Sequence, residues 1–501
     1  MSQINVSNLT FYYDGSYDNI FEDVSFSIDT NWKLGFIGRN GRGKTTFLNL
    51  LLEKYEYRGS ITKSVVVDYF PYPVLDEWKQ ENTIDVMEHL QPEYELWKIC
   101  RELTLLQVDS EVLYRPFETL SFGEQTKVLL ALLFSQDNHF LLIDEPTNHL
   151  DMQARELVKD YLNSKKGFIL VSHDRYFLDS CIDHVLVINR ADIVVEVGNF
   201  SSWWENKRRQ DEYELAENDR LKKDIARLEA SARRTSEWAD KAEGCKIGFN
   251  PLVKEKSIDS RAYYGEKSRR MQQRRKNLEH RQQNAIDDKK QLLKNLETVD
   301  DLKLFPLEYH KERLLEVKDF AIYYEERKIT KDLNFTINRG DRIILRGGNG
   351  CGKSSVIKYI QGEKIQTTGE FMMAGGLKIS YVSQDTSHLK GTLPDYIRDH
   401  EINESLFKAI LRKLDFERLQ FDKTMENFSG GQKKKVLLAT SLCEQAHLYI
   451  WDEPLNFVDI FSRMQIEQLI EEFKPTMLIV EHDKFFVEKI ATKIIDFASV
   501  N

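Results

Sequence analysis

The chain has 501 residues, of which 41% are hydrophobic and 30% charged, as is typical of a water-soluble protein with two or three domains. Its net charge of −10 argues against a general nucleic-acid binder, and its longest apolar runs are too short to span a bilayer. The first residues do not resemble an export signal, and the five cysteines are widely spaced and odd in number. We therefore expect a cytoplasmic protein without disulfides.

The first 200 residues contain a phosphate-binding loop. Ile4 to Tyr13 and Val24 to Ile28 alternate like strands, and the apolar run Leu34 to Ile37 leads into Gly38-Arg-Asn-Gly-Arg-Gly-Lys-Thr45. This run matches G-x-x-x-x-G-K-[ST] with a strand before it and a helix after it. The glycines let backbone N–H groups face phosphate oxygens at a helix N-terminus. Lys44 is expected to pair with the β- and γ-phosphates, and Thr45 to bind Mg²⁺.

Two further strands end in polar residues. Phe140 to Ile143 runs into Asp144 and Glu145. Paired carboxylates at the end of a buried parallel strand are what Mg²⁺ and a hydrolytic water require, so we expect Asp144 to hold the metal and Glu145 to orient or deprotonate the water. Phe168 to Val171 leads to His173, which is either a catalytic residue or a packed histidine at a strand end. Its position in a chain with the other two motifs favours catalysis.

The middle of the chain has a different pattern. Leu221, Ile225, Leu228 and Ala232 follow the alternating steps of a coiled-coil seam, and Leu278, Ala285, Leu292, Leu296 and Val299 resume it. Gly244, Gly248, Asn250 and Pro251 are expected to end the first helix. Residues 241–276 hold about 11 basic and about 4 acidic side chains. We predict two antiparallel helices with a basic tip, which would reach about 60 Å.

The motifs recur in the same order after this stretch. Arg342 to Leu345 leads into Gly347-Gly-Asn-Gly-Cys-Gly-Lys-Ser354, a later strand ends in Asp452 and Glu453, and another ends in Glu481-His482. Lys353 and Ser354 take the expected roles of Lys44 and Thr45. The sequence thus predicts an α/β protein in which a long antiparallel helical hairpin joins two nucleotide-binding domains. The expected boundaries are residues 1–202, 203–310 with a tip near 244–264, and 311–501.

A further motif lies between each phosphate loop and its acidic strand. Leu120-Ser-Phe-Gly-Glu-Gln125 and Phe428-Ser-Gly-Gly-Gln432 resemble the L-S-G-G-Q signature of ATP-binding cassette (ABC) proteins. The resemblance implies that each ATP lies between one domain's phosphate loop and the other domain's signature. It implies Glu145, Glu453, His173 and His482 as catalytic residues, and Thr45, Asp144, Ser354, Gln384 and Asp452 at Mg²⁺. The residues implied in ATP binding are Tyr13, Gly38, Asn40, Gly41, Gly43, Lys44, Thr45, Thr46, Ser121, Gly123, Glu124, Tyr324, Gly347, Asn349, Gly350, Gly352, Lys353, Ser354, Ser355, Ser429, Gly430, Gly431 and Gln432.

Some of these residues allow a second interpretation, and two positions depart from the family pattern. Tyr13 and Tyr324 stand where the family places a ring against adenine, but either could be a core aromatic. Tyr72 occupies the place of the glutamine that Gln384 provides in the second domain, and Phe122 replaces a signature glycine. Because the sites are composite, each would carry one departure. We expect both to bind ATP and to turn over at different rates.

The acidic strand of the first domain continues as Glu145-Pro-Thr-Asn-His-Leu-Asp151, which looks like the ABC-F class of twin-cassette proteins that act on ribosomes. The second copy, Glu453-Pro-Leu-Asn-Phe-Val-Asp459, is similar to the Lsa/Vga-type antibiotic-resistance branch. This resemblance implies a monomer that binds the 70S ribosome and protects its peptidyl-transferase centre from lincosamides, pleuromutilins and streptogramin A. The linker would enter the tRNA exit site toward 23S rRNA and P-site tRNA, and ATP hydrolysis would release the protein.

Other functions remain open at this point. The chain could be a housekeeping translation factor, a DNA-associated ABC ATPase or the ATPase subunit of a transporter, although the last two do not account for a hairpin of this length. The hairpin could also be a solvated spacer. If it is functional, its tip would contact RNA, with aromatic rings that stack on bases or pack the turn itself. The tip residues expected at RNA are Phe249, Tyr263, Tyr264, Arg269, Arg270, Arg274, Arg275 and Lys276.

Overall fold

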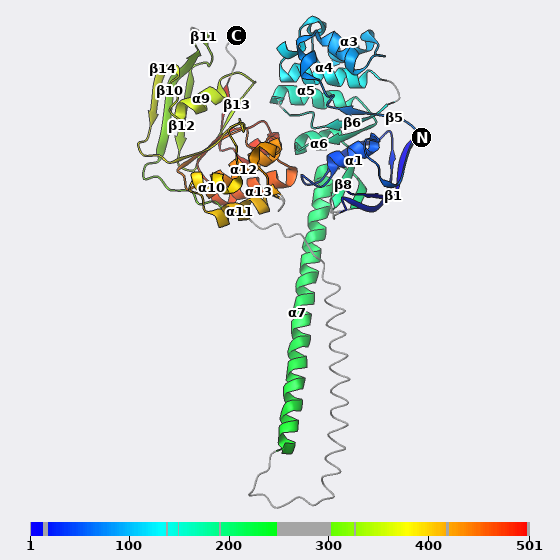
Figure 1. The fold of residues 1–501 in the computed structure, drawn as a ribbon. Coiled ribbons are helices and arrows are strands. Elements are labelled where there is room, and N and C mark those ends of the chain that lie inside the picture. The colour runs from blue at the N-terminus through cyan, green and yellow to red at the C-terminus, as the bar shows by residue number, and fades with distance from the viewer. Residues whose placement is uncertain are drawn as a thin grey trace, which may run out of the picture. The chain divides into compact units, whose positions relative to one another are not determined.

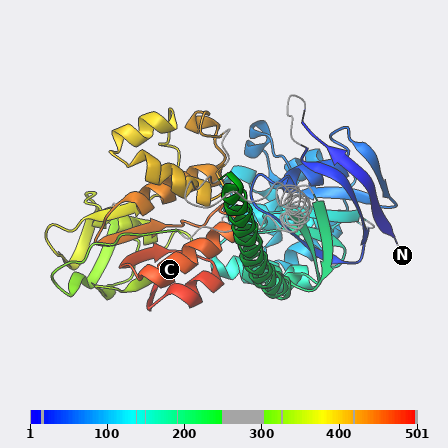
Figure 2. The ribbon, with the colours of Figure 1, turned by 90° about the horizontal axis from the view of Figure 1, so that it is seen from below.

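The computed structural model describes residues 2–13, 19–136, 139–148, 150–189, 192–247, 302–324, 327–416 and 420–497. The chain divides into one unit of Met1–Trp203 with Asp300–Asn501 and a second unit of Trp204–Val299. The first unit contains two α/β bodies, here called the first cassette (up to Trp203) and the second cassette (from residue 302). Figures 1 and 2 both show these cassettes side by side, the first in blue to green and the second in yellow to red.

The first cassette is built on a six-stranded sheet in the order β5-β6-β7-β3-β8-β9, with an antiparallel sheet β2-β1-β4 beside its core. All neighbours in the larger sheet are parallel except β8 and β9. The strands are β1 (Gln3–Phe11), β2 (Phe21–Asp29), β3 (Lys33–Ile37), β4 (Arg58–Lys63), β5 (Val66–Phe70), β6 (His139–Asp144), β7 (Phe168–Val171), β8 (His184–Asn189) and β9 (Asp192–Val197).

Its helices connect these strands and cover them. Because parallel strands are buried on both faces, β7 reads as four consecutive buried apolar residues. The helices are α1 (Lys44–Leu51), α2 (Thr83–Leu90), α3 (Leu96–Leu105), α4 (Phe122–Phe134), α5 (Met152–Asn163) and α6 (Arg175–Cys181), with short 3₁₀ turns η1 (Asp76–Gln80), η2 (Ser110–Tyr114) and η3 (Phe117–Thr119).

The second cassette repeats this plan, which confirms the predicted duplication. Its parallel sheet has the order β15-β16-β17-β13-β18, and β10 pairs with β11, β12 and β14. The elements are β10 (Arg313–Tyr324), β11 (Arg327–Lys328), β12 (Leu333–Asn338), β13 (Arg342–Gly347), α9 (Lys353–Ile360), β14 (Gln366–Met373), β15 (Ile379–Val382), α10 (Leu393–Asp399), α11 (Glu404–Lys413), η5 (Met425–Asn427), α12 (Gly430–Cys443), β16 (Leu448–Asp452), α13 (Ile460–Phe473), β17 (Met477–Val480), α14 (Lys484–Ile490) and β18 (Lys493–Phe497).

Side chains of the two cassettes make several direct contacts. Arg175 of α6 forms an ion pair with Glu467 of α13, which is fully buried. Nearby, the Lys484 ammonium donates to the Tyr176 hydroxyl at 3.1 Å. The phosphate loop takes part as well, because the Asn40 amide donates to the backbone carbonyl of Phe457 at 3.2 Å.

The linker begins with a single long helix, α7 (Phe200–Ile247), whose 48 residues correspond to a length of about 72 Å. Figure 1 shows it without interruption. The helix continues past Gly244, so the prediction that this glycine helps to stop it was wrong. One glycine in a helix interior costs only about 1 kcal/mol relative to alanine, which a helix of this length tolerates. The expected return helix, the tip beyond Ile247 and all residues predicted to contact RNA lie outside the described residues.

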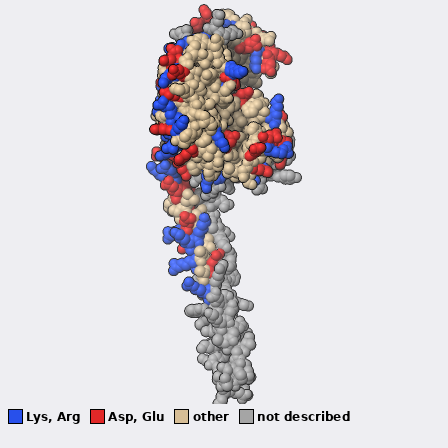
Figure 3. Space-filling model, turned by 90° about the vertical axis from the view of Figure 1, so that its left-hand side faces the viewer, with Lys and Arg blue, Asp and Glu red and all other residues tan. Residues whose placement is uncertain are grey.

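The described part of α7 is rich in charge, as Figure 3 shows by its mixed blue and red side chains. Lys207 pairs with Asp211 at 3.0 Å across one helical turn, a spacing that supports a helix on its own. Ile225 is buried as the predicted seam requires, and the same spacing continues backwards through buried Asn218 and Glu214. Within the described ranges, none of the helices is long and apolar enough to cross a bilayer.

Candidate active site

The two phosphate loops have nearly the same conformation. Gly43 and Gly352, the residues before α1 and α9, have φ of 92° and 95°. A Cβ at Gly352 would come within 2.5 Å of Thr330, so a side chain there meets both backbone strain and a clash. The ammonium groups of Lys44 and Lys353 donate to carbonyls of their own loops, at 2.7 Å from Gly38 and 2.8 Å from Gly347. Both lysines are therefore at the helix N-termini where phosphates bind.

The acidic strand ends place two carboxylates beside each loop. The Thr45 hydroxyl lies 3.5 Å from Asp144 in the first cassette. Glu145 and Glu453, which follow the strands, have φ of 51° and 47°. Such left-handed backbone costs about 1 kcal/mol for a residue with a Cβ, and it is held here by N–H bonds to the carbonyls of Val171 and Val480. The glutamates thus turn out of the sheet, toward the cavities.

Burial sets the protonation of these groups. Burial and the adjacent Asp144 raise the pKa of Glu145 to about 8. Burial also raises the pKa of Asp452, to about 6. The histidines behave oppositely, since burial lowers the pKa of His482 to about 3 and that of His173 well below its usual value. Both rings are therefore neutral near pH 7 and can accept a hydrogen bond. Their Nε2 atoms lie 3.4 Å and 4.0 Å from the carboxylates of Glu145 and Glu453, respectively.

Each signature motif begins a helix with a capping box. The Ser429 hydroxyl accepts from the Gln432 N–H at 3.3 Å, and the Gln432 side chain accepts from the Ser429 N–H at 3.0 Å. Ser121 and Glu124 make the same reciprocal pair at the start of α4. The capping box fixes where each helix begins, so the N-terminus points in a defined direction. Phe122, directly after Ser121, is 65% exposed.

One cavity, here called the Lys44 site, has a volume of about 620 Å³ and is lined by both cassettes. The first cassette supplies its phosphate loop and acidic strand end, and the second supplies its signature. Among the predicted residues, those that line it are Asn40, Gly41, Lys44, Thr45, Asp144, Glu145, His173, Ser429, Gly430, Gly431 and Gln432. Tyr69, Asp415 and Lys435 also line it, although no motif marked them, and so does Phe457. Phe457 is the residue that departs from histidine in the second Asp-Glu segment.

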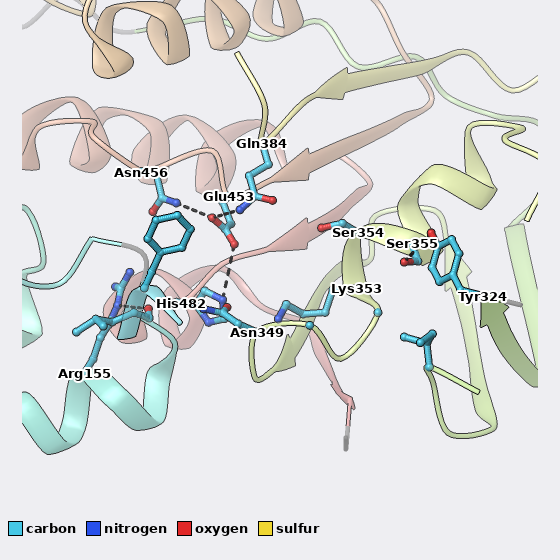
Figure 4. Close-up of a pocket in the computed structure, with 15 residues that line it drawn as sticks. Arg155, Tyr324, Asn349, Lys353, Ser354, Ser355, Gln384, Glu453, Asn456 and His482 are labelled. Atoms are coloured by element: carbon cyan, nitrogen blue, oxygen red, sulfur yellow. Dashed lines mark hydrogen bonds and ion pairs between the residues drawn. The ribbon is translucent and has the colours of Figure 1, made fainter. Parts of the chain in front are cut away.

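The other cavity, the Lys353 site, has a volume of about 490 Å³ and is drawn in Figure 4. The predicted residues on its wall are Tyr324, Asn349, Gly350, Gly352, Lys353, Ser354, Ser355, Gln384, Glu453 and His482. The first cassette contributes Phe122, Leu150 and Arg155. Both cavities are thus lined by both cassettes in the head-to-tail order that the resemblance implied, although the first signature contributes only Phe122. Figure 4 also shows Asn456 beside Glu453, to which its amide donates at 2.6 Å.

Several predicted residues do not line these cavities. Of the first signature only Phe122 reaches the wall, since Ser121, Gly123 and Glu124 are absent from it and Glu124 is occupied with the helix cap. In the described residues, the walls also omit Tyr13, Gly38, Gly43, Thr46, Gly347 and Asp452. Phe249, Tyr263, Tyr264, Arg269, Arg270, Arg274, Arg275 and Lys276 fall outside the described residues.

The two tyrosines proposed to face adenine are not core residues. Tyr13 and Tyr324 are 41% and 47% exposed. Their hydroxyls bond equivalent residues after the phosphate-loop lysines, Thr46 at 2.9 Å and Ser355 at 3.2 Å. Each ring thus stands on the first turn of the helix that follows its phosphate loop.

The sites differ most after β5 and β15. The strand registers, Val67 opposite Phe140 and Ile379 opposite Leu448, place Tyr72 and Gln384 at equivalent positions. The Gln384 amide donates to Glu453 at 2.8 Å. The Tyr72 hydroxyl is buried and has no hydrogen-bond partner among the described residues. In the Lys44 site it is Tyr69 that reaches the acidic strand, where its hydroxyl donates to Asp144 at 3.0 Å. Tyr72 thus occupies the position of the glutamine but does not make the glutamine's hydrogen bond to the acidic pair.

The acidic strand ends fit a divalent cation bound together with a phosphate. Asp452 Oδ1 is buried and lacks a hydrogen-bond partner among the described residues, while the Ser354 hydroxyl bonds the same carboxyl group. A hard cation satisfies such oxygens, and Mg²⁺ in nucleotide sites takes few protein ligands beside the phosphates.

Residues 21–148 and 330–456 match the sequence pattern of the ABC transporter family, one match in each cassette. These segments cover about half of the chain and contain both phosphate loops, signatures and acidic strand ends. The chain therefore belongs to the ABC family. It binds and hydrolyses ATP.

Its relatives include members of the ABC-F class, so the resemblance read from the sequence is confirmed. The chain is 28% identical over 497 residues to ribosome protection protein VmlR of Bacillus subtilis, covering 95% of this chain and 84% of that protein. It is 24% identical to the energy-dependent translational throttle protein EttA of Haemophilus influenzae, covering 96% and 89%. It is also 24% identical to ABC transporter F family member 2 of Arabidopsis thaliana, covering 99% and 76%.

Solved structures with the same fold include an archaeal ribosome recycling factor, aABCE1, in complex with stalk protein aP1. That chain superposes with a TM-score of 0.62 at 17% identity, covering 98% of this chain and 88% of its own length. The likeness supports the tandem-cassette fold.

Proposed function

We propose that each composite site binds ATP with Mg²⁺ and that the ionised carboxylates of Glu145 and Glu453 activate the attacking water, the raised pKa of Glu145 making its ionised form a stronger base. The carboxylate oxygens of these residues are next to the neutral rings of His173 and His482, which can accept hydrogen bonds from water or orient it. Lys44 and Lys353 would leave their loop carbonyls for the β- and γ-phosphates. Thr45 with Asp144, and Ser354 with Asp452, would hold Mg²⁺, whose charge balances the phosphates.

The opposite cassette completes each site, the Lys44 site with the signature residues Ser429 to Gln432 and the Lys353 site with Phe122. The capped N-terminus of α12 faces the Lys44 cavity with Ser429 and two glycines, so its N–H groups can meet the γ-phosphate. An intact triphosphate then holds the cassettes together, and hydrolysis weakens the contact. ATP is thereby a ligand that prefers the closed state.

For the target, we propose the ribosome, and for the role, protection of the peptidyl-transferase centre from antibiotics. The observation that supports this is the combination of twin cassettes with the 48-residue helix α7 between them, in a chain similar to VmlR over nearly its whole length. A helix of about 72 Å is long enough to reach a buried centre of a large particle. The linker would enter the tRNA exit site toward 23S rRNA and P-site tRNA, in the cytoplasm and as a monomer.

Antibiotic susceptibility tests this role directly. Expression of the wild-type chain in a susceptible Gram-positive strain should raise the inhibitory concentrations of lincosamides, pleuromutilins or streptogramin A. The Glu145→Gln/Glu453→Gln chain, expressed to the same level, should not. If the tip meets phosphates, ribosome binding should weaken when glutamine replaces Arg269, Arg270, Arg274, Arg275 and Lys276. The affinity of this variant should also depend less on salt concentration. Unchanged sensitivity with the wild-type chain would contradict the resistance role.

The alternative is a housekeeping translation factor, which the similarity to EttA favours. In that case the chain binds ribosomes and changes translation without any drug. Ribosome profiling of a deletion strain separates the two roles, since a housekeeping factor alters ribosome occupancy in drug-free medium. A protection protein alters occupancy only when the drug is present.

A further inference from the structure

A lysine in the second cassette is buried where apolar residues are expected. Lys434 lies on α12, one turn beyond the signature, and is only 2% exposed. A buried ammonium is unfavourable unless it is hydrogen-bonded. Its Nζ donates to the backbone carbonyls of Ser383 at 2.8 Å and of Asp452 at 3.2 Å.

These two carbonyls stand immediately before two residues of the Lys353 site. Ser383 precedes Gln384, and Asp452 precedes Glu453. The strands β15 and β16 pair in parallel up to Val382 and Trp451, so Lys434 joins the two chains just where strand pairing ends. Beyond that point, the Gln384 amide bonds the Glu453 carboxylate at 2.8 Å, as the dashed line in Figure 4 shows.

The first cassette lacks both parts of this arrangement. Counting from the signature serines, the residue equivalent to Lys434 is Thr126, which is shorter and uncharged. The residue equivalent to Gln384 is Tyr72, whose hydroxyl makes no hydrogen bond among the described residues. Lysine and glutamine thus occur together in one cassette and are replaced together in the other.

We propose that Lys434 is a positioning residue for ATP hydrolysis at the Lys353 site: by tying the carbonyls of Ser383 and Asp452 together, it holds Gln384 and Glu453 in the geometry that activates water. This inference rests on the proposed catalytic role of Glu453 and is independent of the ribosomal target. Lys434 acts through the backbone and does not touch the nucleotide. Although the N-terminus of α12 faces the Lys44 site, Lys434 on this helix affects ATP turnover at the Lys353 site.

Burial and nearby charge act on Lys434 in opposite directions. Burial lowers its pKa to about 8, while four carboxylates oppose the shift: Asp452, Glu453, Glu481 and Asp385. The ammonium form makes charge-assisted hydrogen bonds to the two carbonyls, which are stronger than those of a neutral amine.

The test measures kcat and KM for ATP with single sites disabled. In a Glu145→Gln background, turnover is that of the Lys353 site. Lys434→Thr, which copies Thr126, should lower kcat there about tenfold with KM changed less than twofold. In a Glu453→Gln background the same substitution should change kcat less than twofold. Lys433→Met, at the neighbouring half-buried lysine, is the matched control and should leave kcat unchanged in both backgrounds.

Lys434→Arg provides the rescue. Because a guanidinium keeps the charge and can donate to both carbonyls, this variant should keep most of the kcat of the Glu145→Gln chain. Thermal melting of each variant reports its fold. Equal losses of kcat in both backgrounds, a change in KM alone, or a kcat of Lys434→Arg as low as that of Lys434→Thr would overturn the proposal. Loss of all turnover in the Glu453→Gln chain that keeps Lys434 would instead contradict the proposed hydrolysis by Glu145 at the Lys44 site.

Discussion

Tyr69 forms a hydrogen bond to the acidic strand of the Lys44 site, and the equivalent tyrosine of the Lys353 site has other partners. Its hydroxyl donates to Asp144, whereas the equivalent Tyr381 bonds toward Ser383 and Gln361. Burial raises the pKa of Asp144, and the bond from Tyr69 opposes that rise. A proposed Mg²⁺ ligand must be ionised, so Tyr69 favours the form that binds the metal.

Tyr69→Phe should therefore move the acid limb of ATP turnover at the Lys44 site toward higher pH. Without the hydroxyl the pKa of Asp144 rises, and the carboxylate is protonated earlier as pH falls. In the Glu453→Gln background, turnover at pH 6 should fall roughly 3- to 10-fold while turnover at pH 8 changes little. Tyr381→Phe in the Glu145→Gln background is the control. An acid limb that stays in place after Tyr69→Phe would contradict the assignment.

At this scale, the sequence revealed the residues that belong to short motifs. Lys44, Asp144, Glu145 and His173 all lie in one cavity as predicted, because each follows a strand of the same parallel sheet. Tyr69 and Lys434 were missed because nothing local marks them. Tyr69 reads as an ordinary strand residue, and Lys434 as part of a basic run on a helix surface. Only the packing of α12 against β15 and β16 makes Lys434 a buried group.

Among the elements, α6 and α13 carry a buried charged contact between the cassettes, from Arg175 to Glu467. Glu467 of α13 is fully buried, and burial raises its pKa while Arg175 opposes the shift. Lys489 also approaches it, at 3.6 Å. The contact at Lys484 of α14 is of another kind, since Lys484 is 39% exposed and its ammonium lies 3.9 Å from Glu156.

Arg175→Met should lower the free energy of unfolding by about 3 kcal/mol, because it leaves a buried carboxylate without its main partner. Lys484→Met, at an exposed pair, should cost about 1 kcal/mol or less. Urea denaturation followed by tryptophan fluorescence measures both. Equal losses of unfolding free energy in the two variants would show that the buried pair stabilises the protein no more than the exposed one.

The predicted elements differ from the observed ones mainly in the linker. Strands before the phosphate loops were clear from their apolar runs. Helix α7 was predicted from its seam, but its end was placed too early because Gly244 was read as a stop. A single glycine is a weak signal inside a long charged helix, where pairs such as Lys207 with Asp211 add support turn by turn.

For the whole molecule, the composite sites link hydrolysis to the separation of the cassettes. If intact ATP holds both signatures against both phosphate loops, a chain that cannot hydrolyse should stay closed. We expect Glu145→Gln/Glu453→Gln to bind ATP and to remain with 70S particles during sedimentation. In ADP the same variant should be released, which serves as the control. Release in ATP as fast as that of the wild-type chain would contradict this scheme.

The shared walls of the two sites also restrict how the duplicated halves of this chain can change. Each site combines one cassette's departure with the other cassette's intact motif. The cassette of the Lys44 loop carries Tyr72, which does not line the cavity, opposite the glycines of the second signature, and the cassette of the Lys353 loop carries Gln384 opposite Phe122. A chain made of two first halves would put Tyr72 and Phe122 together in both sites, and two second halves would have neither. Copying of one half onto the other by recombination would therefore erase the difference between the sites in a single event. The halves can therefore specialise only as a complementary pair, because a substitution in either half changes a site that both halves build.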